Sequence, residues 1–225
     1  MTVVDDTLVS VLEDRLEALL RARRAGTITP EAEAEVAAIS RTMTRPMPPH
    51  PPFCVLMAGL PGSGKTSLSR ALTARGFIRL CPDEEMFRRH GVYGVDFPRG
   101  VFPTLERPVL EDVGIDLREQ LKAGQDVVVD HGFWIPEDRA KWRAIATDAG
   151  ATPVLVYLAA SHDELWARIS RRNDFHAHDP NSIYFSESDL QRYRTRFVPP
   201  QEDEPHVLYD GDPAAVIAAL DAARS

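Results

Sequence analysis

From residue 53 onward, short apolar runs alternate with longer stretches in which apolar side chains recur every three or four positions. The short runs have the length of buried strands, and the longer stretches have the period of amphipathic helices. The predicted strands span residues 53–58, 77–80, 126–130, 152–158 and 206–210. This alternation predicts an α/β fold, a three-layer sandwich around a five-stranded parallel sheet.

A different pattern occupies residues 1–45, which we predict to form a helical hairpin. Leucines recur at helical spacing between residues 8 and 20, and Gly26 is a suitable helix end. A Thr-Pro-Glu sequence at 29–31 suits the start of a second helix, with a capping hydroxyl, a proline at the first position and an acid in the first turn.

These patterns divide the chain into three predicted parts. Residues 1–45 are the hairpin, residues 46–52 (PMPPHPP) are a stiff, extended linker, and residues 53–225 are the main domain. We expect the hairpin helices to pack on the main domain or on a second copy of the chain, which would give a homodimer. The alternative is that they form a dedicated regulatory element.

The most informative stretch is FCVLMAGLPGSGKT at 53–66, a predicted strand followed by the phosphate-binding P-loop pattern. Its glycines permit a tight turn in which backbone N–H groups converge on phosphate oxygens, and the next helix directs its positive N-terminal end at the same place. The predicted ATP contacts are Gly59, Leu60, Pro61, Gly62, Ser63, Gly64, Lys65, Thr66 and Ser67. The alternative is a glycine-rich turn that fits the pattern by chance.

Within this loop, Lys65 should reach the β- and γ-phosphates, and the hydroxyl group of Thr66 should bind Mg²⁺. Asp130 ends an apolar strand, as the Walker B aspartate does, and is the second predicted magnesium residue. The alternatives for Asp130 are a contact with the phosphate acceptor or a cap on the following turn. His131 could contact the acceptor, although a hydrogen-bonded turn histidine is the commoner case.

Asp83 follows the second predicted strand, at the strand edge where open α/β sheets bind their ligands. A carboxylate beside the γ-phosphate can accept the proton of an acceptor hydroxyl, so Asp83 is the predicted general base. The alternative is that Asp83 only caps the helix that begins there.

The loop at 91–103 is rich in glycine, proline and aromatic residues and is the predicted acceptor-binding loop. Its aromatic side chains could line a pocket, or they could equally serve as a hydrophobic plug, and its charged side chains could orient a polar acceptor. The side chains concerned are Tyr93, Asp96, Phe97, Arg99 and Phe102.

Arg168, Arg171 and Arg172 share one face of a predicted helix that precedes a polar stretch. We predict that residues 168–186 form a lid whose arginines stabilise the charge of the transferring phosphoryl group and whose closure excludes water. The alternative is a solvated basic face.

The composition of the chain limits the kinds of binding partner that we expect. The chain of 225 residues has a net charge of −8 and a pI near 5.4, which weighs against an extended nucleic-acid surface. Cys54 and Cys81 are predicted to be reduced packing residues. We found neither a signal-peptide pattern nor an apolar run long enough to cross a bilayer, so we expect a cytoplasmic protein without a membrane partner.

From residue 53 to 225, the order of elements resembles P-loop kinases of the polynucleotide-kinase and zeta-toxin type, which include small antibiotic phosphotransferases and other AAA_33-like ATP-binding proteins. The resemblance rests on GLPGSGKT at 59–66, CPDEE at 81–85, VVVDHGF at 127–133, and the arginines of 168–173 followed by FVPPQEDEP at 197–205. The hairpin lies outside it.

The resemblance implies catalytic roles for Asp83, Lys65, Arg168 and Arg172, with Arg168 and either Arg171 or Arg172 clamping phosphates from the lid. Polynucleotide kinases often carry an arginine shortly after the aspartate. Here the next basic residues are the two arginines at 88–89, which leaves nucleic-acid gripping by that route unsupported.

The function predicted from the sequence is ATP-dependent phosphorylation of a hydroxyl group on a small molecule such as an antibiotic, a nucleoside or a sugar. One alternative is a polynucleotide 5′-hydroxyl kinase, against which the acidic net charge weighs. Another is an ATP-binding switch or toxin-like module regulated through the N-terminal helices.

Overall fold

The computed structural model describes residues 6–43, 50–174 and 184–224. The chain forms two compact units, Met1–Pro49 and His50–Ser225. Throughout these described ranges, no helix combines the length and the apolar character that crossing a bilayer requires.

The first unit is a helical hairpin, as predicted. Helix α1 spans Asp6–Arg24 and helix α2 spans Pro30–Met43. Leu19 packs with the buried apolar residues of α2, and the helices are also joined by an ion pair between Arg15 and Glu35 at 2.8 Å. Of the predicted linker, residues 46–49 lie outside the described residues. Its last residue, Pro52, already belongs to the second unit, where its carbonyl accepts a hydrogen bond from the Thr152 amide at 2.8 Å.

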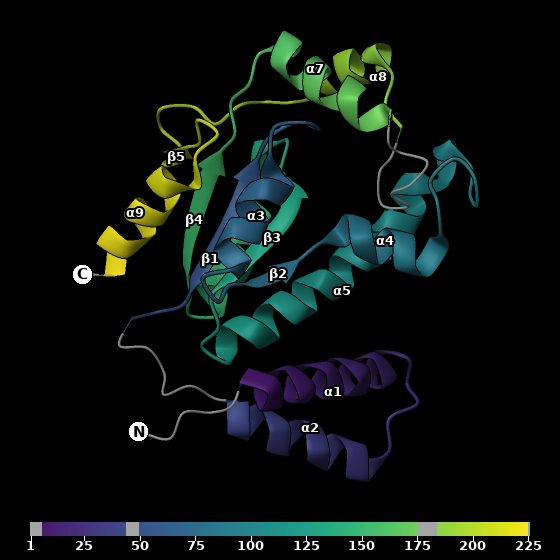
Figure 1. The fold of residues 1–225 in the computed structure, drawn as a ribbon, viewed down its shortest axis with the longest axis vertical. Helices are drawn as coiled ribbons and strands as arrows, with labels where there is room; N and C mark the ends of the chain where they lie inside the picture. Colours follow the sequence, from purple (N-terminus) through teal and green to yellow (C-terminus); the bar gives the residue numbers. More distant parts are fainter. Residues whose placement is uncertain (1–5, 44–49, 175–183, 225) are drawn as a thin grey trace. The chain divides into compact units, whose positions relative to one another are not determined.

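The second unit is built around a five-stranded, wholly parallel sheet, which confirms the predicted α/β class (Figure 1). In space the strands follow the order β2-β3-β1-β4-β5. Their bounds are β1 Phe53–Ala58, β2 Ile78–Leu80, β3 Val127–Gly132, β4 Thr152–Tyr157 and β5 Val207–Leu208. The short strand β1 therefore lies at the centre, and the loops after β1, β2 and β3 meet at one edge of the sheet.

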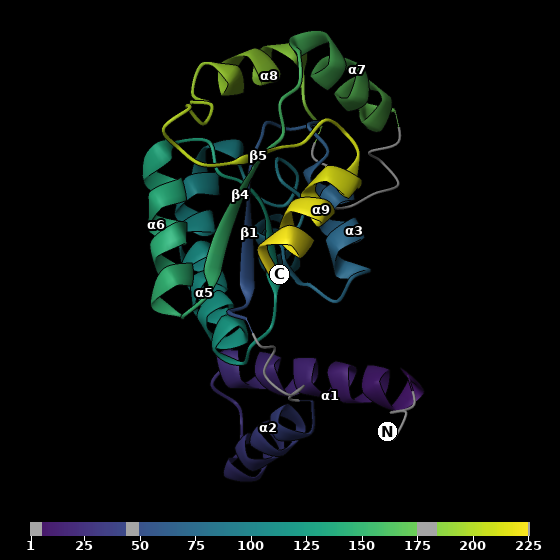
Figure 2. The same cartoon turned by 90° about the vertical axis from the view of Figure 1, so that its left-hand side faces the viewer.

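Helices cover both faces of this sheet. Figure 2 shows α5 and α6 on one face and α3 and α9 on the other. The helices are α3 Lys65–Thr73, α4 Pro82–His90, α5 Phe102–Lys122, α6 Pro136–Asp148, α7 His162–Asn173, α8 Glu187–Arg194 and α9 Pro213–Arg224, with a 3₁₀ turn at Arg99–Val101. The predicted three-layer sandwich is confirmed.

Alternate side chains of β1 enter two hydrophobic clusters, one on each face. Cys54 and Leu56 join the cluster beneath α5 and α6, and Val55 and Met57 join the cluster beneath α3 and α9. All four are fully buried, because β1 is covered on both faces. Cys54 and Cys81 are both free thiols; Cys54 is buried, as predicted for a packing residue, whereas Cys81 is only partly buried.

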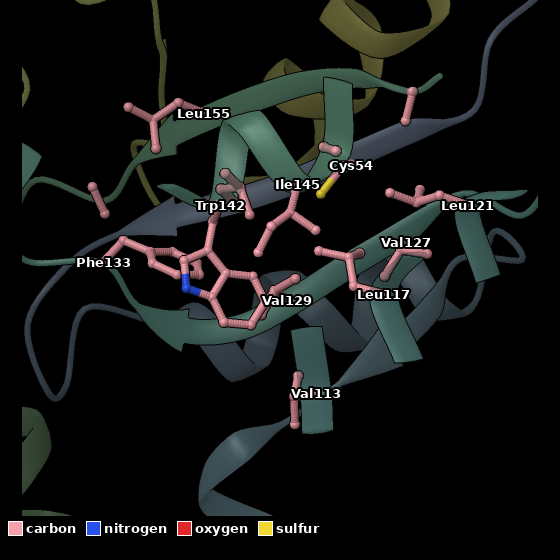
Figure 3. Packing of buried hydrophobic residues seen from close by; sticks show 14 of the residues in the cluster. Cys54, Val113, Leu117, Leu121, Val127, Val129, Phe133, Trp142, Ile145 and Leu155 are labelled. Carbon is pink, nitrogen blue, oxygen red and sulfur yellow. The ribbon is translucent and has the colours of Figure 1, made fainter. Parts of the chain in front are cut away.

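Figure 3 shows the first cluster, where Leu117 of α5 and Trp142 and Ile145 of α6 pack around Val127 and Val129 of β3. Burying side chains of this size stabilises a fold by about 1.5–3 kcal/mol each. The cluster therefore fixes β3, and with it the polar residues at the end of β3, against α5 and α6.

The pairing of β1 with β3 is irregular at the edge where the loops meet. Leu56 lies opposite Val129, but the next residue, Met57, lies opposite Gly132. The additional residues of β3 are Asp130 and His131. Such a bulge interrupts the alternation of side chains and redirects them, and it is common next to active sites.

Helices α7 and α8 pack on the P-loop side of the sheet, above the strand ends (Figure 1). Leu60 of the P-loop joins a small cluster with Leu165 and Ile169 of α7 and Leu190 of α8. Asn173 hydrogen-bonds both backbone groups of Phe185, so the end of α7 is tied to the residues before α8. Most of the polar stretch of the predicted lid, residues 175–183, lies outside the described residues.

A buried ion pair fixes the segment that returns from α8 to the sheet. Arg139 of α6 has no exposed surface, and it donates to both carboxylate oxygens of Glu204 at 2.9 and 2.6 Å and to the Val198 carbonyl at 2.9 Å. Burying a guanidinium group is tolerable only with such partners.

Replacing Arg139 by alanine should therefore strongly destabilise the protein. The Arg139→Ala variant leaves the Glu204 carboxylate without its main partner, and the expected loss in the free energy of unfolding is about 3–5 kcal/mol. Urea unfolding measures this loss. The matched control is Arg107→Ala, whose ion pair with Glu111 is exposed, and its loss should stay below about 1 kcal/mol. Equal losses in the two variants would contradict the role assigned to the buried pair.

Candidate active site

The P-loop joins the end of β1 to α3 and has the backbone of a phosphate-binding turn. Gly62 and Gly64 have φ values of 82° and 102°, a conformation that side chains with a Cβ rarely adopt. A Cβ on Gly59 would lie only 2.6 Å from the Ser63 hydroxyl oxygen. Larger residues at these positions would strain the loop or fill its concave side.

Lys65, the first residue of α3, folds back over this loop. Its Nζ donates hydrogen bonds to the carbonyls of Gly59 at 3.1 Å and Leu60 at 2.9 Å. Burial lowers the pKa of Lys65, while the negative charges of Asp130 and Asp83 act in the opposite direction. The amine is thus held against the backbone of the loop, where the charges of both carboxylates act on it.

The loop fits a phosphate group. Ser63 is buried, and its hydroxyl group has no hydrogen-bond partner among the described residues. A buried polar atom without a partner is unfavourable unless a ligand or water completes it. Thr66 and Ser67 lie exposed in the first turn of α3, whose N-terminal end favours negative charge.

Asp130 is engaged by a cation that the sequence did not indicate. Arg79 of β2 donates to one oxygen of Asp130, Oδ2, from Nε at 2.9 Å and from Nη2 at 2.6 Å. The same guanidinium group also bonds Glu84 at 2.9 Å. Arg79 therefore fixes the orientation of Asp130. The magnesium role of Asp130 stays a prediction, and Oδ1 is the oxygen that would bind the ion.

Asp83, Glu106 and His131 converge at one place, where the charge of Asp83 acts on Lys65 and the charge of Lys65 acts on His131. One side-chain oxygen or nitrogen atom from each lies within 4.8 Å of the others. They come from three elements, since Asp83 is in the first turn of α4, Glu106 is on α5 and His131 is in the β3 bulge. The structure thus places the predicted base, Asp83, and the weaker candidate, His131, at one location.

Glu106 was missed by the sequence reasoning. A signal for it exists, because Glu106 occupies the same helical stripe as Phe102, Val109 and Val113, which pack into the core. An acidic residue on the buried stripe of an amphipathic helix indicates either a paired charge or a site.

The surroundings of Glu106 and His131 favour the uncharged forms of these two side chains. Burial raises the pKa of Glu106 to about 7, and the negative charges of Asp83 and Asp138 act in the same direction. Burial also lowers the pKa of His131, an effect that Asp83 opposes and Lys65 reinforces. Near neutral pH, Glu106 can therefore either donate or accept a hydrogen bond, and His131 is a neutral imidazole.

The predicted lid arginines take three different positions on α7. Arg168 donates to the Gly62 carbonyl of the P-loop at 3.2 Å. Arg172 lies 5.7 Å from the centroid of the Phe185 ring, and its charge contributes to lowering the pKa of Lys65. Arg171 is exposed. Arg168 thus contacts the P-loop, Arg172 acts on it through charge, and the roles of both stay predictions.

The aromatic side chains of the loop at 91–103 pack inward as a hydrophobic plug, which is one of the two alternatives considered for them. Phe97 is buried, with its ring centroid 5.8 Å from that of Tyr93 and 6.3 Å from that of Phe102. All three pack against the core cluster beneath α5. Asp96 holds the turn by accepting a hydrogen bond from the Val92 amide at 2.6 Å. The side chain of Arg99 lies outside the described residues.

Comparison with known proteins places this arrangement in a family. Residues 54–200 match the family model AAA_33, described as an AAA domain. The chain belongs to this family. The family assignment confirms the resemblance that the motifs indicated. No curated protein sequence gave a significant match.

Several solved structures share this fold. A protein from Chloroflexus aurantiacus j-10-fl, described as a candidate kinase, is 24% identical with a TM-score of 0.60, and the match covers 77% of this chain and 98% of that one. A gluconokinase from Sinorhizobium meliloti 1021 is 20% identical, with a TM-score of 0.52 over 78% and 93% of the two chains. The APS kinase CysC of Mycobacterium tuberculosis is 20% identical, with a TM-score of 0.53 over 79% and 100%.

The raised pKa of Glu106 makes stability depend on pH in a defined direction. Between the ordinary value of 4.5 and about 7, the folded state holds a proton at Glu106 that the unfolded state has lost, so the free energy of unfolding falls as pH rises. The Glu106→Gln variant has no carboxyl group at this position, so its free energy of unfolding lacks this fall. The difference in the free energy of unfolding between Glu106→Gln and wild type should favour the variant by about 1–2 kcal/mol more at pH 8 than at pH 4. This figure allows for the partial exposure of Glu106.

Urea unfolding of both proteins at the two pH values measures this gain. Glu111→Gln is the matched control, because Glu111 lies on the same helix and is exposed. A Glu106→Gln difference that does not change with pH would show that the environment described for Glu106 is wrong.

Proposed function

We propose that the chain transfers the γ-phosphoryl group of ATP to a hydroxyl group of a small molecule. The observation that carries this proposal is that a phosphate-binding loop and a carboxylate that can accept a proton lie close together. A phosphate-binding loop with Lys65 on its concave side faces a carboxylate, Asp83, close enough for their charges to interact. This is the pairing that phosphoryl transfer to an alcohol needs.

The P-loop would hold the phosphates of ATP through its backbone amides, Ser63 and Lys65. Thr66 and Asp130 would hold Mg²⁺, which neutralises phosphate charge when bound. The APS kinase with the same fold was solved with AMPPNP, and this supports nucleotide use here. A cytoplasmic location, expected from the sequence, belongs to the same proposal.

In the proposed reaction the acceptor oxygen attacks the γ-phosphorus of ATP. The new bond joins these two atoms, the bond from the γ-phosphorus to the bridging oxygen of ADP breaks, and the hydroxyl proton passes to Asp83. Arg168, which contacts the P-loop, and Arg172, whose charge acts on Lys65, would offset the negative charge on the phosphoryl oxygens.

A small acceptor is favoured because the side of the site that faces it is acidic. Asp83 and Asp138 contribute negative charge there, and both raise the pKa of Glu106. A polynucleotide end would bring its own phosphates to this surface, and they would be repelled.

The arginines after Asp83 are also engaged elsewhere. Arg88 bonds Glu85 at 2.6 Å, and Arg89 bonds Glu85 at 2.6 Å and Asp112 at 2.7 Å. A guanidinium group in such an ion pair would have to break existing bonds in order to bind a nucleic-acid phosphate. This supports the small-molecule proposal over the polynucleotide alternative.

Lys65→Ala should abolish phosphoryl transfer and weaken ATP binding, because it removes the cation on the concave side of the P-loop. Calorimetric titration with ATP and Mg²⁺, together with a transfer assay, measures the two effects. Lys122→Ala, which removes an exposed lysine at the end of α5, should leave both unchanged. Full transfer by Lys65→Ala would show that the loop is not the phosphate site.

Asp83→Asn should leave ATP affinity nearly intact and lower the rate of transfer by about 10²–10⁴-fold, the range expected for the loss of a general base. Single-turnover transfer separates this rate from binding. Glu111→Gln serves as an exposed carboxylate-to-amide control. If Asp83→Asn transfers at the wild-type rate, the proton must go to another group, and Asp130 or Asp96 becomes the candidate.

A further inference from the structure

We infer that Arg79 is a positioning residue that keeps the proposed base, Asp83, at a fixed place relative to the end of β3. This inference rests on the proposed function and adds a residue to its active site. The guanidinium group of Arg79 joins Asp130 of β3 to Glu84 of α4, and Asp83 is the neighbour of Glu84 in the first turn of α4. One side chain therefore connects the strand that ends beside the P-loop with the helix that carries the base.

The register of the sheet brings Arg79 to Asp130. Strands β2 and β3 are parallel, and Arg79 lies opposite Val128. Asp130 follows two residues later on β3, a diagonal separation that a long side chain on the neighbouring strand can span. Nε and Nη2 of Arg79 donate to Oδ2 of Asp130 at 2.9 and 2.6 Å. Because the Asp130 side chain is only 3% exposed and that of Arg79 18%, solvent screens this ion pair little.

The other side of the guanidinium group holds the first turn of α4. Nη1 of Arg79 donates to Oε1 of Glu84 at 2.9 Å. The N-cap residue of this helix, Cys81, forms no side-chain cap hydrogen bond, and α4 has only nine residues. A helix this short depends on its tertiary contacts. The ion pair with Glu84 therefore helps to fix the turn in which Asp83 lies.

The guanidinium group spans the same two elements whose side chains converge in the site. The residue after Asp130 in the β3 bulge is His131. The residue before Glu84 in α4 is Asp83, and one side-chain atom of Asp83 lies within 4.8 Å of one of His131. A shift of α4 against the end of β3 would change this spacing and the distance from Asp83 to Lys65, on which its charge acts. A displacement of about 1 Å at a reacting group can lower a rate by about 10²-fold.

The bridge uses the shape of the guanidinium group. Its planar fork carries donors that point in different directions, so it bonds Asp130 through two nitrogens and Glu84 through the third. An exposed ion pair contributes little to the stability of a fold, and the Glu84 side chain is 45% exposed. The bond to Glu84 is therefore better explained by the position of α4 than by stability.

Amide hydrogen exchange in α4 measures whether the bridge holds this helix. In Glu84→Ala, which keeps the buried ion pair of Arg79, exchange should become about 3- to 5-fold faster, the effect expected for the loss of one partly exposed ion pair. Arg79→Gln should increase the rate of exchange at least as much, because it removes the bonds on both sides. Asp221→Ala is the matched control, since it removes an exposed acid paired with Arg75, and exchange in α4 should stay unchanged.

Single-turnover transfer from γ-labelled ATP measures what the position of α4 contributes to the reaction. The acceptors are a mixture of nucleosides, sugars and hydroxylated antibiotics, and then the acceptor that the label identifies. Glu84→Ala should lower the rate of transfer by about 5- to 20-fold and leave ATP affinity within about 2-fold of wild type. In the Asp83→Asn background the same change should lower the rate by less than about 2-fold, because the base that the bridge positions is absent.

Three results would overturn the inference. Equal losses of rate from Glu84→Ala in the wild-type and Asp83→Asn backgrounds would show that the bridge serves only the stability of the fold. Unchanged amide exchange in α4 of Glu84→Ala, in a chain that transfers phosphate, would show that the bridge does not hold the helix. Both of these results leave the kinase proposal standing. No transfer by the wild-type chain to any acceptor contradicts the kinase proposal and the positioning role together.

Discussion

The site depends on one constraint, the burial of β1 at the centre of the sheet. Because β3 and β4 flank β1 and helices cover both faces, the end of β1 cannot move without disturbing two hydrophobic clusters. The P-loop therefore starts from a fixed point. The same packing carries the ends of β2 and β3 to that edge, so Lys65, Asp83 and His131 meet although they are far apart in the sequence.

The charges of neighbouring side chains set the pairing and the protonation of the polar groups at this edge of the sheet. Arg79 forms an ion pair with Asp130, and the charges of Asp130 and Asp83 both act to raise the pKa of Lys65. Among the described residues no cation pairs with Glu106, and burial raises the pKa of this carboxyl group to about 7. The site thus separates into a cationic side formed by the P-loop and the arginines of α7, and an acidic, hydrogen-bonding side formed by α4, α5 and the β3 bulge. This polarity matches a phosphate donor on one side and a neutral acceptor on the other.

The sequence predicted the sheet, its parallel strands and the hairpin, because these follow from local periodicity and glycine or proline signals. It also indicated Lys65 and Asp83, which lie in recognisable motifs. It could not indicate Arg79 as the partner of Asp130 or the approach of Glu106 to Asp83, since both depend on the order of strands and on the bulge in β3. The aromatic loop was undecided for the same reason, as only packing shows that Phe97 is buried.

The measurement that tests this account most directly follows the γ-phosphate itself. The full chain is incubated with γ-labelled ATP and Mg²⁺, in parallel with hydroxylated small molecules, with 5′-hydroxyl oligonucleotides and without any acceptor. The account predicts that label appears on a small molecule. Label on the oligonucleotides alone would contradict the acidic acceptor side described here, and bound ATP with no transfer to any pool would make the chain a nucleotide-dependent switch instead of a kinase.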